Sequence, residues 1–417
     1  MLHIRFWACA LLASAILPVG LEAGAEPLSI NEAVTIAIEA NDPAVTLFEE
    51  KAAALEERAI ADSQLADPRL SLGLLNWPVD SFRYTQEPMT RVQVGVKQAF
   101  PRGQTLSLRR QRRLAEAKTE RAKLDLQLRQ IALDTRIAWL ELHYWLGARG
   151  RVKANRQAVA DLVEVTTSVY ATGRQVSHDV LRAELELSLL DDRIVNVERR
   201  IAMARADLAR LVGPQATLRV SPDAAYRLPI PLPRESLRQD LARHPSVSVE
   251  DAHILVRNHD IDLARQQYKP GWTIDVGYGA RGAGRADFAS VGIAIDLPFF
   301  TGKRQDRGLA AAKRERQAAR LERDARLLEL NKLLDRSYAD WQRAGERVEL
   351  YERAVTVRAM ETTKAALGAY RSGVSDFAEL IRSRLAEFDA DLMLLRLRVD
   401  RGQVQAQLLY LQGKDHE

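Results

Sequence analysis

The chain carries the same series of landmarks twice, about 200 residues apart. Four pairs keep both their order and their spacing: Pro43 and Pro245, Pro68 and Pro270, Tyr170-x-x-Gly173 and Tyr370-x-x-Gly373, and Leu211-x-Gly213 and Leu411-x-Gly413. Repeats that share order and spacing fold into equivalent units. We therefore expect a first structural repeat over residues 26–213, a Pro-rich linker over 214–234, a second repeat over 235–413, and a short tail over 414–417.

The N-terminus has the pattern of a secretory signal. Arg5 precedes an apolar run, and Ala23-Gly24-Ala25 offers a small-residue cleavage site, so we expect residues 1–25 to be removed on export. Cys9 is the single cysteine and lies early in this segment, which disfavours lipidation and leaves the mature chain without disulfides. No later run is long and apolar enough for a membrane helix.

Each repeat contains a pair of segments that alternate between apolar and polar residues. The pairs fall near residues 69–100 and near 271–299; Leu70-Ser71-Leu72-Gly73-Leu74 and Trp272-Thr273-Ile274-Asp275-Val276 are examples. Alternation with a period of two predicts a strand with one apolar and one polar face. Lengths near ten residues suit tilted strands that cross a bilayer, so we expect four such strands in the chain.

Long helices follow each strand pair. Apolar residues recur at spacings of three and four from Leu114 to Trp145 and again from Leu327 to Val355, which is the seam of a coiled coil. Residues 104–170 contain no proline and span about 100 Å at about 1.5 Å per residue. The expected fold is therefore mainly α with a small β part. A Ser29 to Glu32 capping box predicts the start of the first short helix.

Four membrane strands cannot close a barrel, because open strand edges are intolerable in lipid and the smallest known barrels have about eight strands. Two copies supply eight strands, whose side chains nearly fill the interior, whereas three copies supply twelve and leave room for a channel. The strands therefore predict a homotrimer. In it, a transmembrane β-barrel continues into an α-barrel of long helices.

The repeated motifs resemble the TolC-like outer-membrane factors, the outer-membrane efflux proteins, over essentially the whole mature chain. The residues that carry the resemblance are the two Tyr-x-x-Gly landmarks, the Asp179-Val180-Leu181 and Glu379-Leu380-Ile381 segments, and the junctions Phe100-Pro101-Arg102-Gly103 and Leu297-Pro298. The family implies a trimeric duct in the bacterial outer membrane with a periplasmic helical extension. It also implies a periplasmic adaptor (membrane fusion) protein and an inner-membrane efflux transporter as partners.

The resemblance also implies a gate at the periplasmic end. Asp179 and Glu379 stand six residues after the glycines of the two landmarks, and three copies of Glu379 around the axis form a carboxylate ring. Tyr370 is expected to hydrogen-bond Asp179 as a latch. Arg382 stands where the family often has a second acidic residue, and it is expected to pair with Glu379. The alternative is that these residues are ordinary solvent-facing helix positions.

The segments Asn76-Trp77-Pro78-Val79-Asp80 and Gln86-Glu87-Pro88-Met89-Thr90 resemble the heavy-metal-efflux branch of the family. Metal cations are therefore the first expected solute. Multidrug or organic-solute export, or type I secretion, through the same fold is the alternative. A periplasmic coiled-coil adaptor or scaffold is the alternative from a different class, although it leaves the alternating strands without a purpose.

No enzymatic chemistry is expected from this sequence. The sequence has no nucleophile elbow, phosphate loop or H-E-x-x-H motif, and its histidines lack ligand spacing, so we expect no catalytic residue, no cofactor and no dedicated metal site. Gly277-x-Gly279-x-x-Gly282 is not followed by the helix that a dinucleotide site needs, so we expect it to form a loop between two strands. The Arg-rich stretch at residues 109–113 is followed by Glu116 and Glu120, which is typical of a solvated helix face.

Overall fold

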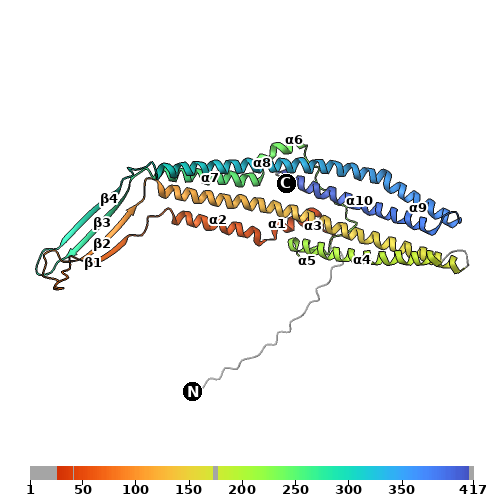
Figure 1. Ribbon diagram of the computed structural model, residues 1–417, viewed down its shortest axis with the longest axis horizontal. Coiled ribbons are helices and arrows are strands. Elements are labelled where there is room, and N and C mark those ends of the chain that lie inside the picture. The colour runs from red at the N-terminus through yellow and green to blue at the C-terminus, as the bar shows by residue number, and fades with distance from the viewer. Residues whose placement is uncertain (1–25, 41, 172–176, 413–417) are drawn as a thin grey trace, which may run out of the picture.

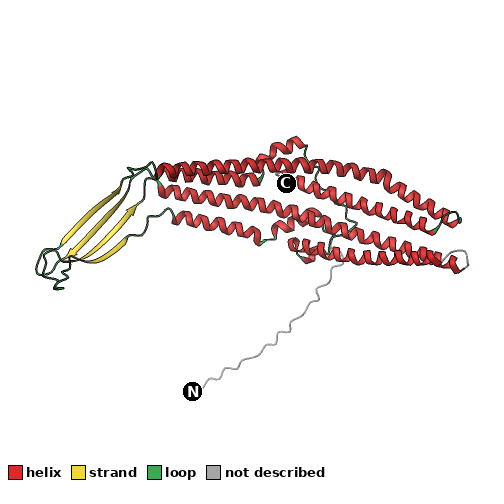
Figure 2. Cartoon of the chain, in the orientation of Figure 1, coloured by secondary structure: helices red, strands yellow, loops and turns green. Residues whose placement is uncertain are grey.

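The computed structural model shows an elongated protein with a small sheet at one end and a long body of helices (Figures 1 and 2). It describes residues 26–40, 42–171 and 177–412. The predicted signal, residues 1–25, and the tail, 414–417, lie outside this part of the chain. The elements in chain order are α1 (Ile30–Glu39), α2 (Pro43–Ala61), β1 (Arg69–Leu75), β2 (Arg91–Phe100), α3 (Thr105–Ala171), α4 (Ser177–Val212), α5 (Pro214–Thr217), α6 (Arg234–Asp240), η1 (Leu241–Arg243), α7 (Pro245–Gln266), β3 (Gly271–Ala280), β4 (Phe288–Asp296), α8 (Gln305–Leu350), η2 (Tyr351–Val355), α9 (Thr356–Arg371) and α10 (Phe377–Gln412).

One pair of sequence landmarks, Pro43 and Pro245, falls at equivalent points of the chain. Pro43 and Pro245 each occupy the first turn of a helix, where a proline loses no hydrogen bond. The residue before each proline is a side-chain cap: an Asp42 carboxylate oxygen accepts from the amide of Ala44, and His244 Nδ1 accepts from the amide of Ser246. The predicted cap at Ser29 is also present, since Ser29 Oγ accepts from the amide of Glu32.

The described strands form one antiparallel sheet in the order β1-β2-β3-β4. The register places Leu70, Val96, Val276 and Val291 side by side in one row across all four strands. Because side chains alternate along a strand, the neighbouring apolar rows lie on this same face. The predicted alternation therefore produces one continuous apolar face, and the mainly helical fold with a small sheet is confirmed.

The opposite face of the sheet carries a row of small residues, Ser71, Gly95, Gly277 and Ser290. A Cβ on Gly95 would lie 2.9 Å from Ser71 Oγ, and a Cβ on Gly277 would lie 2.9 Å from Ser290 Oγ. A Cβ at either position would require the facing serine side chain to move, so glycine fits this row without any adjustment. The prediction that the Gly277 motif forms a loop is thus wrong for its first half: Gly277 and Gly279 belong to β3, and only Gly282 lies in the following loop.

The helices at the sheet end lie in the same order as the strands. Contacts run from α2 to α3, from α3 to α7 and from α7 to α8. As predicted, α3 is one unbroken helix of 67 residues. Its counterpart in the second repeat is not continuous in the same way: the π-helical segment η2 separates α8 from α9, and the amide of Thr356 bonds back to the carbonyl of Tyr351. Periodicity alone did not predict this change, because the apolar spacing continues through it.

A buried core in the middle of the body holds the first described residues and the linker against the long helices. Trp139 of α3 is fully buried, and its Nε1–H donates to the carbonyl of Leu28. The linker packs on α10, where the Tyr226 hydroxyl donates to the carbonyl of Arg398 and the Gln405 amide donates to that of Pro229. In the described ranges, no helix is both long and apolar enough to cross a bilayer.

His244 makes the stability of the second repeat sensitive to acid. Burial lowers its pKa to about 4 from 6.5. Between these values the unfolded chain binds a proton that the folded chain does not, so the free energy of unfolding falls as the pH drops through this window, by about 3 kcal/mol at most. Above pH 6.5 the residue has no effect. Chemical denaturation measured across this range checks the slope.

The variant His244→Asn is the matched control, because asparagine keeps a cap acceptor but cannot titrate. Its denaturation midpoint should fall less between pH 6.5 and about 4 than that of the wild type, with the remaining slope due to other groups such as buried His143, whose pKa burial also lowers. An unchanged slope in His244→Asn would contradict this assignment.

Candidate functional site

The hairpin between α9 and α10 lies at the end of the molecule opposite the sheet (Figure 1). The second Tyr-x-x-Gly landmark ends α9. The amide of Gly373 bonds to the carbonyl of Tyr370 at 3.1 Å, and the amide of Val374 bonds to that of Ala369 at 2.9 Å. Gly373 has φ of +74°, so this is a Schellman cap that favours glycine. The landmark therefore marks a helix end that turns the chain into α10.

The first turn of α10 separates a buried face from a charged face. Phe377, Leu380 and Ile381 are buried against neighbouring helices, whereas Glu379 and Arg382 are exposed. Asp376 caps the helix by accepting from the amide of Glu379 at 2.9 Å. The predicted pairing is present, since Arg382 Nη1 donates to Glu379 Oε2 in an ion pair one helical turn apart. The two charges are thus presented together at the tip.

Tyr370 does not lie on the charged face. It is buried, its ring meets that of Phe377 edge-on at 5.9 Å, and its hydroxyl lies 3.4 Å from Thr166 Oγ1 of α3. It therefore links the α9–α10 hairpin to the end of α3. The backbone of Asp179 belongs to α4, but its side chain and residues 172–176 lie outside the described part, so the Tyr370–Asp179 latch stays a prediction.

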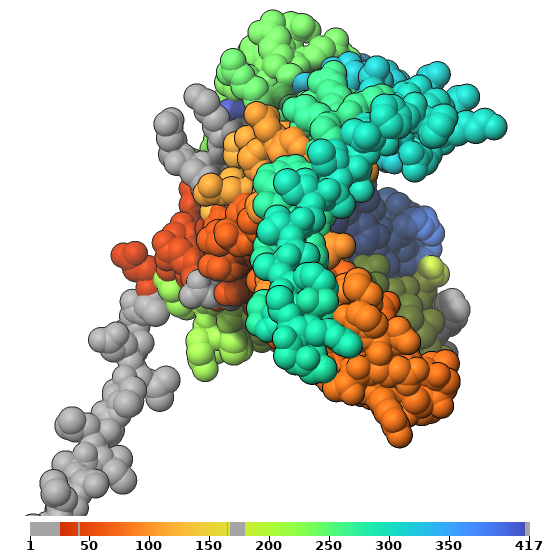
Figure 3. Space-filling view, turned by 90° about the vertical axis from the view of Figure 1, so that its left-hand side faces the viewer, coloured from red at the N-terminus to blue at the C-terminus, as the bar shows by residue number. Residues whose placement is uncertain are grey.

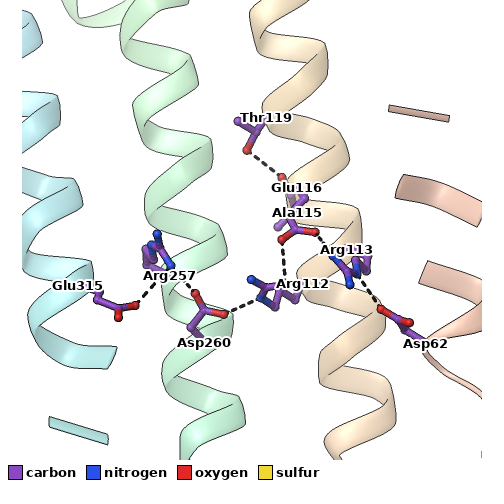
Figure 4. Close-up of polar contacts among 9 residues, drawn as sticks. All are labelled: Asp62, Arg112, Arg113, Ala115, Glu116, Thr119, Arg257, Asp260 and Glu315. Atoms are coloured by element: carbon purple, nitrogen blue, oxygen red, sulfur yellow. Dashed lines mark hydrogen bonds and ion pairs between the residues drawn. The ribbon is translucent and has the colours of Figure 1, made fainter. Parts of the chain in front are cut away.

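A second group of charged side chains crosses four helices near the sheet end (Figure 4). Arg113 Nε donates to Asp62 at the end of α2 at 2.7 Å, and Arg112 Nε donates to Asp260 of α7 at 2.6 Å. Both arginines also bind Glu116 on their own helix α3, each at 2.9 Å. Arg257 extends the series from Asp260 to Glu315 of α8. We call these seven residues the charge ladder.

The charge ladder connects α2, α3, α7 and α8 in the order in which they lie side by side. The hydrogen bond from Arg113 lowers the pKa of the Asp62 carboxyl below its usual range, so the carboxyl is ionised over the physiological range. The prediction that residues 109–113 form only a solvated helix face is therefore wrong for Arg112 and Arg113, although it holds for exposed Arg109 and Arg110. The sequence did carry a signal for this pairing, because Glu116 stands four residues after Arg112 and three after Arg113.

The potential metal ligands among the described residues are histidine, aspartate and glutamate side chains. No group of three or more His, Cys, Asp or Glu side chains there could hold a metal ion. His143 and His244, both buried, are used in packing and hydrogen bonds to backbone carbonyls.

The fold of the chain is that of outer-membrane channel proteins. It superposes on a membrane protein from Pseudomonas aeruginosa with a TM-score of 0.78 at 15% identity, covering 92% of this chain and 93% of that one. The outer membrane protein VceC from Vibrio cholerae gives 0.75 at 17% identity, covering 93% and 97%. CusC gives 0.75 at 14% identity, covering 95% and 96%.

Residues 237–414, most of the second repeat, match the outer membrane efflux protein family. The resemblance to the TolC-like outer-membrane factors is thereby confirmed. Proteins of this family are transport ducts without enzymatic activity, so the prediction that the chain is not an enzyme is also confirmed. The sequence has no match among curated proteins.

The charge ladder predicts a measurable loss when its central arginine is removed. Arg112→Met keeps the aliphatic volume but removes one of the two arginines that bind each of the partly buried carboxylates of Asp260 and Glu116. We expect a stability loss of about 1–3 kcal/mol that shrinks at high ionic strength. Denaturation in detergent at low and high salt measures it. Arg110→Met, at an exposed position without an ion pair in the described structure, is the control, and equal losses in the two variants would contradict the assignment.

Proposed function

We propose that three copies of this chain close edge to edge into an efflux duct of the outer membrane. The open sheet is the observation that carries this proposal. In the described structure β1 pairs with β2 and β4 pairs with β3, while every residue of both edge strands is exposed. Unpaired edge groups cannot stay in hydrocarbon, so β4 of one copy must pair with β1 of the next.

The need for an open channel determines the proposed number of copies. Three copies give a barrel of twelve strands, in which the apolar rows face lipid and the serine-glycine row faces the lumen. The edge helices α2 and α8 meet their neighbours in the same way and form the α-barrel. The two repeats, residues 26–213 and 235–413 joined by the linker 214–234, then place six near-equivalent units around the axis.

The family match supports a proposal for the partners, and a loop resemblance supports one for the solute. The helical body extends into the periplasm and receives solutes from a periplasmic adaptor and an inner-membrane efflux transporter. Metal cations are the first candidate solute, on the resemblance of the loop after β1 to the heavy-metal-efflux branch. Multidrug, organic-solute or type I secretion export is the alternative. The family match argues against the soluble adaptor or scaffold of the different class.

We assign the gate to the tip of the α9–α10 hairpin. Glu379 is exposed there, and three copies around the axis bring three carboxylates together, each beside the guanidinium of its own Arg382. Tyr370 holds this hairpin to α3 from the buried side, with Asp179 of α4 as its proposed latch partner. This arrangement supports a narrow, mixed-charge constriction that restricts ion flow.

Single-channel recording in planar bilayers tests the duct and its gate. The wild type should form cation-preferring pores of low open probability. Glu379→Ala should raise conductance by about twofold or more, because the constriction loses its carboxylate ring. Glu349→Ala, which removes the carboxylate of another exposed ion pair far from the tip, should leave conductance unchanged. If Glu379→Ala conducts like the wild type, the gate assignment is wrong, and if no pore forms, the duct is wrong.

Arg382→Ala tests the pairing separately. Without its guanidinium, the Glu379 carboxylate is no longer partly neutralised, so the preference for cations over anions should increase. Reversal potentials in a salt gradient measure this preference. A preference equal to that of the wild type would show that Arg382 does not act on the permeating ions.

A further inference from the structure

The junction between β4 and α8 exposes large apolar side chains beyond the end of the sheet. Phe299 is 77% exposed and Phe300 is 84% exposed. They follow the apolar face, which ends in Phe100 and Trp272, stacked at 4.0 Å between ring centroids. The cyan segment that follows β4 projects from the body of the molecule at the upper right (Figure 3). Exposed aromatic residues at the rim of an apolar face are typical of a membrane interface.

Basic side chains lie immediately beyond these aromatic residues. Lys269, Lys303, Arg304 and Arg307 are all exposed, and in the described structure none of them forms an ion pair. Nearby acidic groups are engaged elsewhere: Asp306 accepts from the Tyr268 hydroxyl at 2.6 Å, and Asp296 lies 3.9 Å from Arg102. Four cations against the Asp306 carboxylate leave this cluster with a net positive charge. These basic residues do not stabilise the start of α8. Arg304 makes no side-chain cap, and cations are unfavourable near the N-terminus of a helix.

We propose that this junction binds the phosphate headgroups of anionic glycerophospholipids in the leaflet next to the helical body. The proposal rests on the proposed membrane insertion of the sheet. The aromatic side chains then lie at headgroup depth, and the basic cluster lies just outside, where a negatively charged lipid surface attracts each lysine or arginine. Three copies of the junction form a ring of such contacts around the duct and fix its depth in the bilayer.

Fluorescence quenching by brominated lipids tests the proposal on the full-length protein in vesicles. Trp272 belongs to the apolar rim, so bromine on the acyl chains of adjacent lipids quenches it. The vesicles contain phosphatidylcholine and phosphatidylglycerol in equal parts, with either one brominated. Stronger quenching by brominated phosphatidylglycerol is expected in the wild type. The combined variant Lys303→Gln, Arg304→Gln and Arg307→Gln should lower this preference by about fivefold or more.

Arg358→Gln with Lys364→Gln is the matched control, because both residues are exposed on α9, far from the sheet. It should keep the preference. Equal quenching by the two lipids in the wild type, or an unchanged preference in the junction variant, would each overturn the headgroup site. Absence of quenching by either lipid would instead mean that the sheet is not in the bilayer, and the proposed function would fail with it.

Discussion

The unpaired edges of the sheet are the constraint on which the account depends. A single four-stranded sheet with one continuous apolar face is unstable both in water and in lipid. In water its apolar rows are exposed, and in lipid the backbone groups of its two edge strands are unpaired. Pairing β4 with β1 of the next copy satisfies both requirements at once. The repeat organisation supports this closure, because each repeat supplies one strand pair and the apolar side chains of both pairs lie on the same face of the sheet.

The helical body transfers this arrangement along the molecule. The helices α2, α3, α7 and α8 keep the order of the strands, and the charge ladder joins them close to the sheet. Because α3 runs unbroken from the junction to the tip, one continuous helix connects the strands with the end of the molecule where the gate is proposed. On the α8 side the π-helical η2 interrupts this path, so the two halves of the body are not mechanically identical.

Much of this architecture could be predicted from local patterns. Ser29 indicated a helix start, the proline-free stretch 104–170 indicated a long helix, and the alternation around Val276 indicated a strand with one apolar side. Other features depend on distant partners. The contact between Arg112 and Asp260 depends on the order of the helices, and the close approach of Gly277 to Ser290 depends on strand register. Neither can be predicted from the local sequence. The π-helical segment left no trace in the spacing of apolar residues, and the burial of Tyr370 reflects the packing of two hairpins.

Cross-linking of the two edge strands between copies tests the central claim most directly. The mature chain should contain no native cysteine, so Leu72→Cys in β1 combined with single cysteines along β4, such as Ile293→Cys, reports only on these edges. For at least one pair, oxidation in the membrane should yield covalent dimers and trimers and no larger species, because a closed ring has no free edge. A protein that stays monomeric for every pair, or a ladder that continues beyond the trimer, would contradict closure.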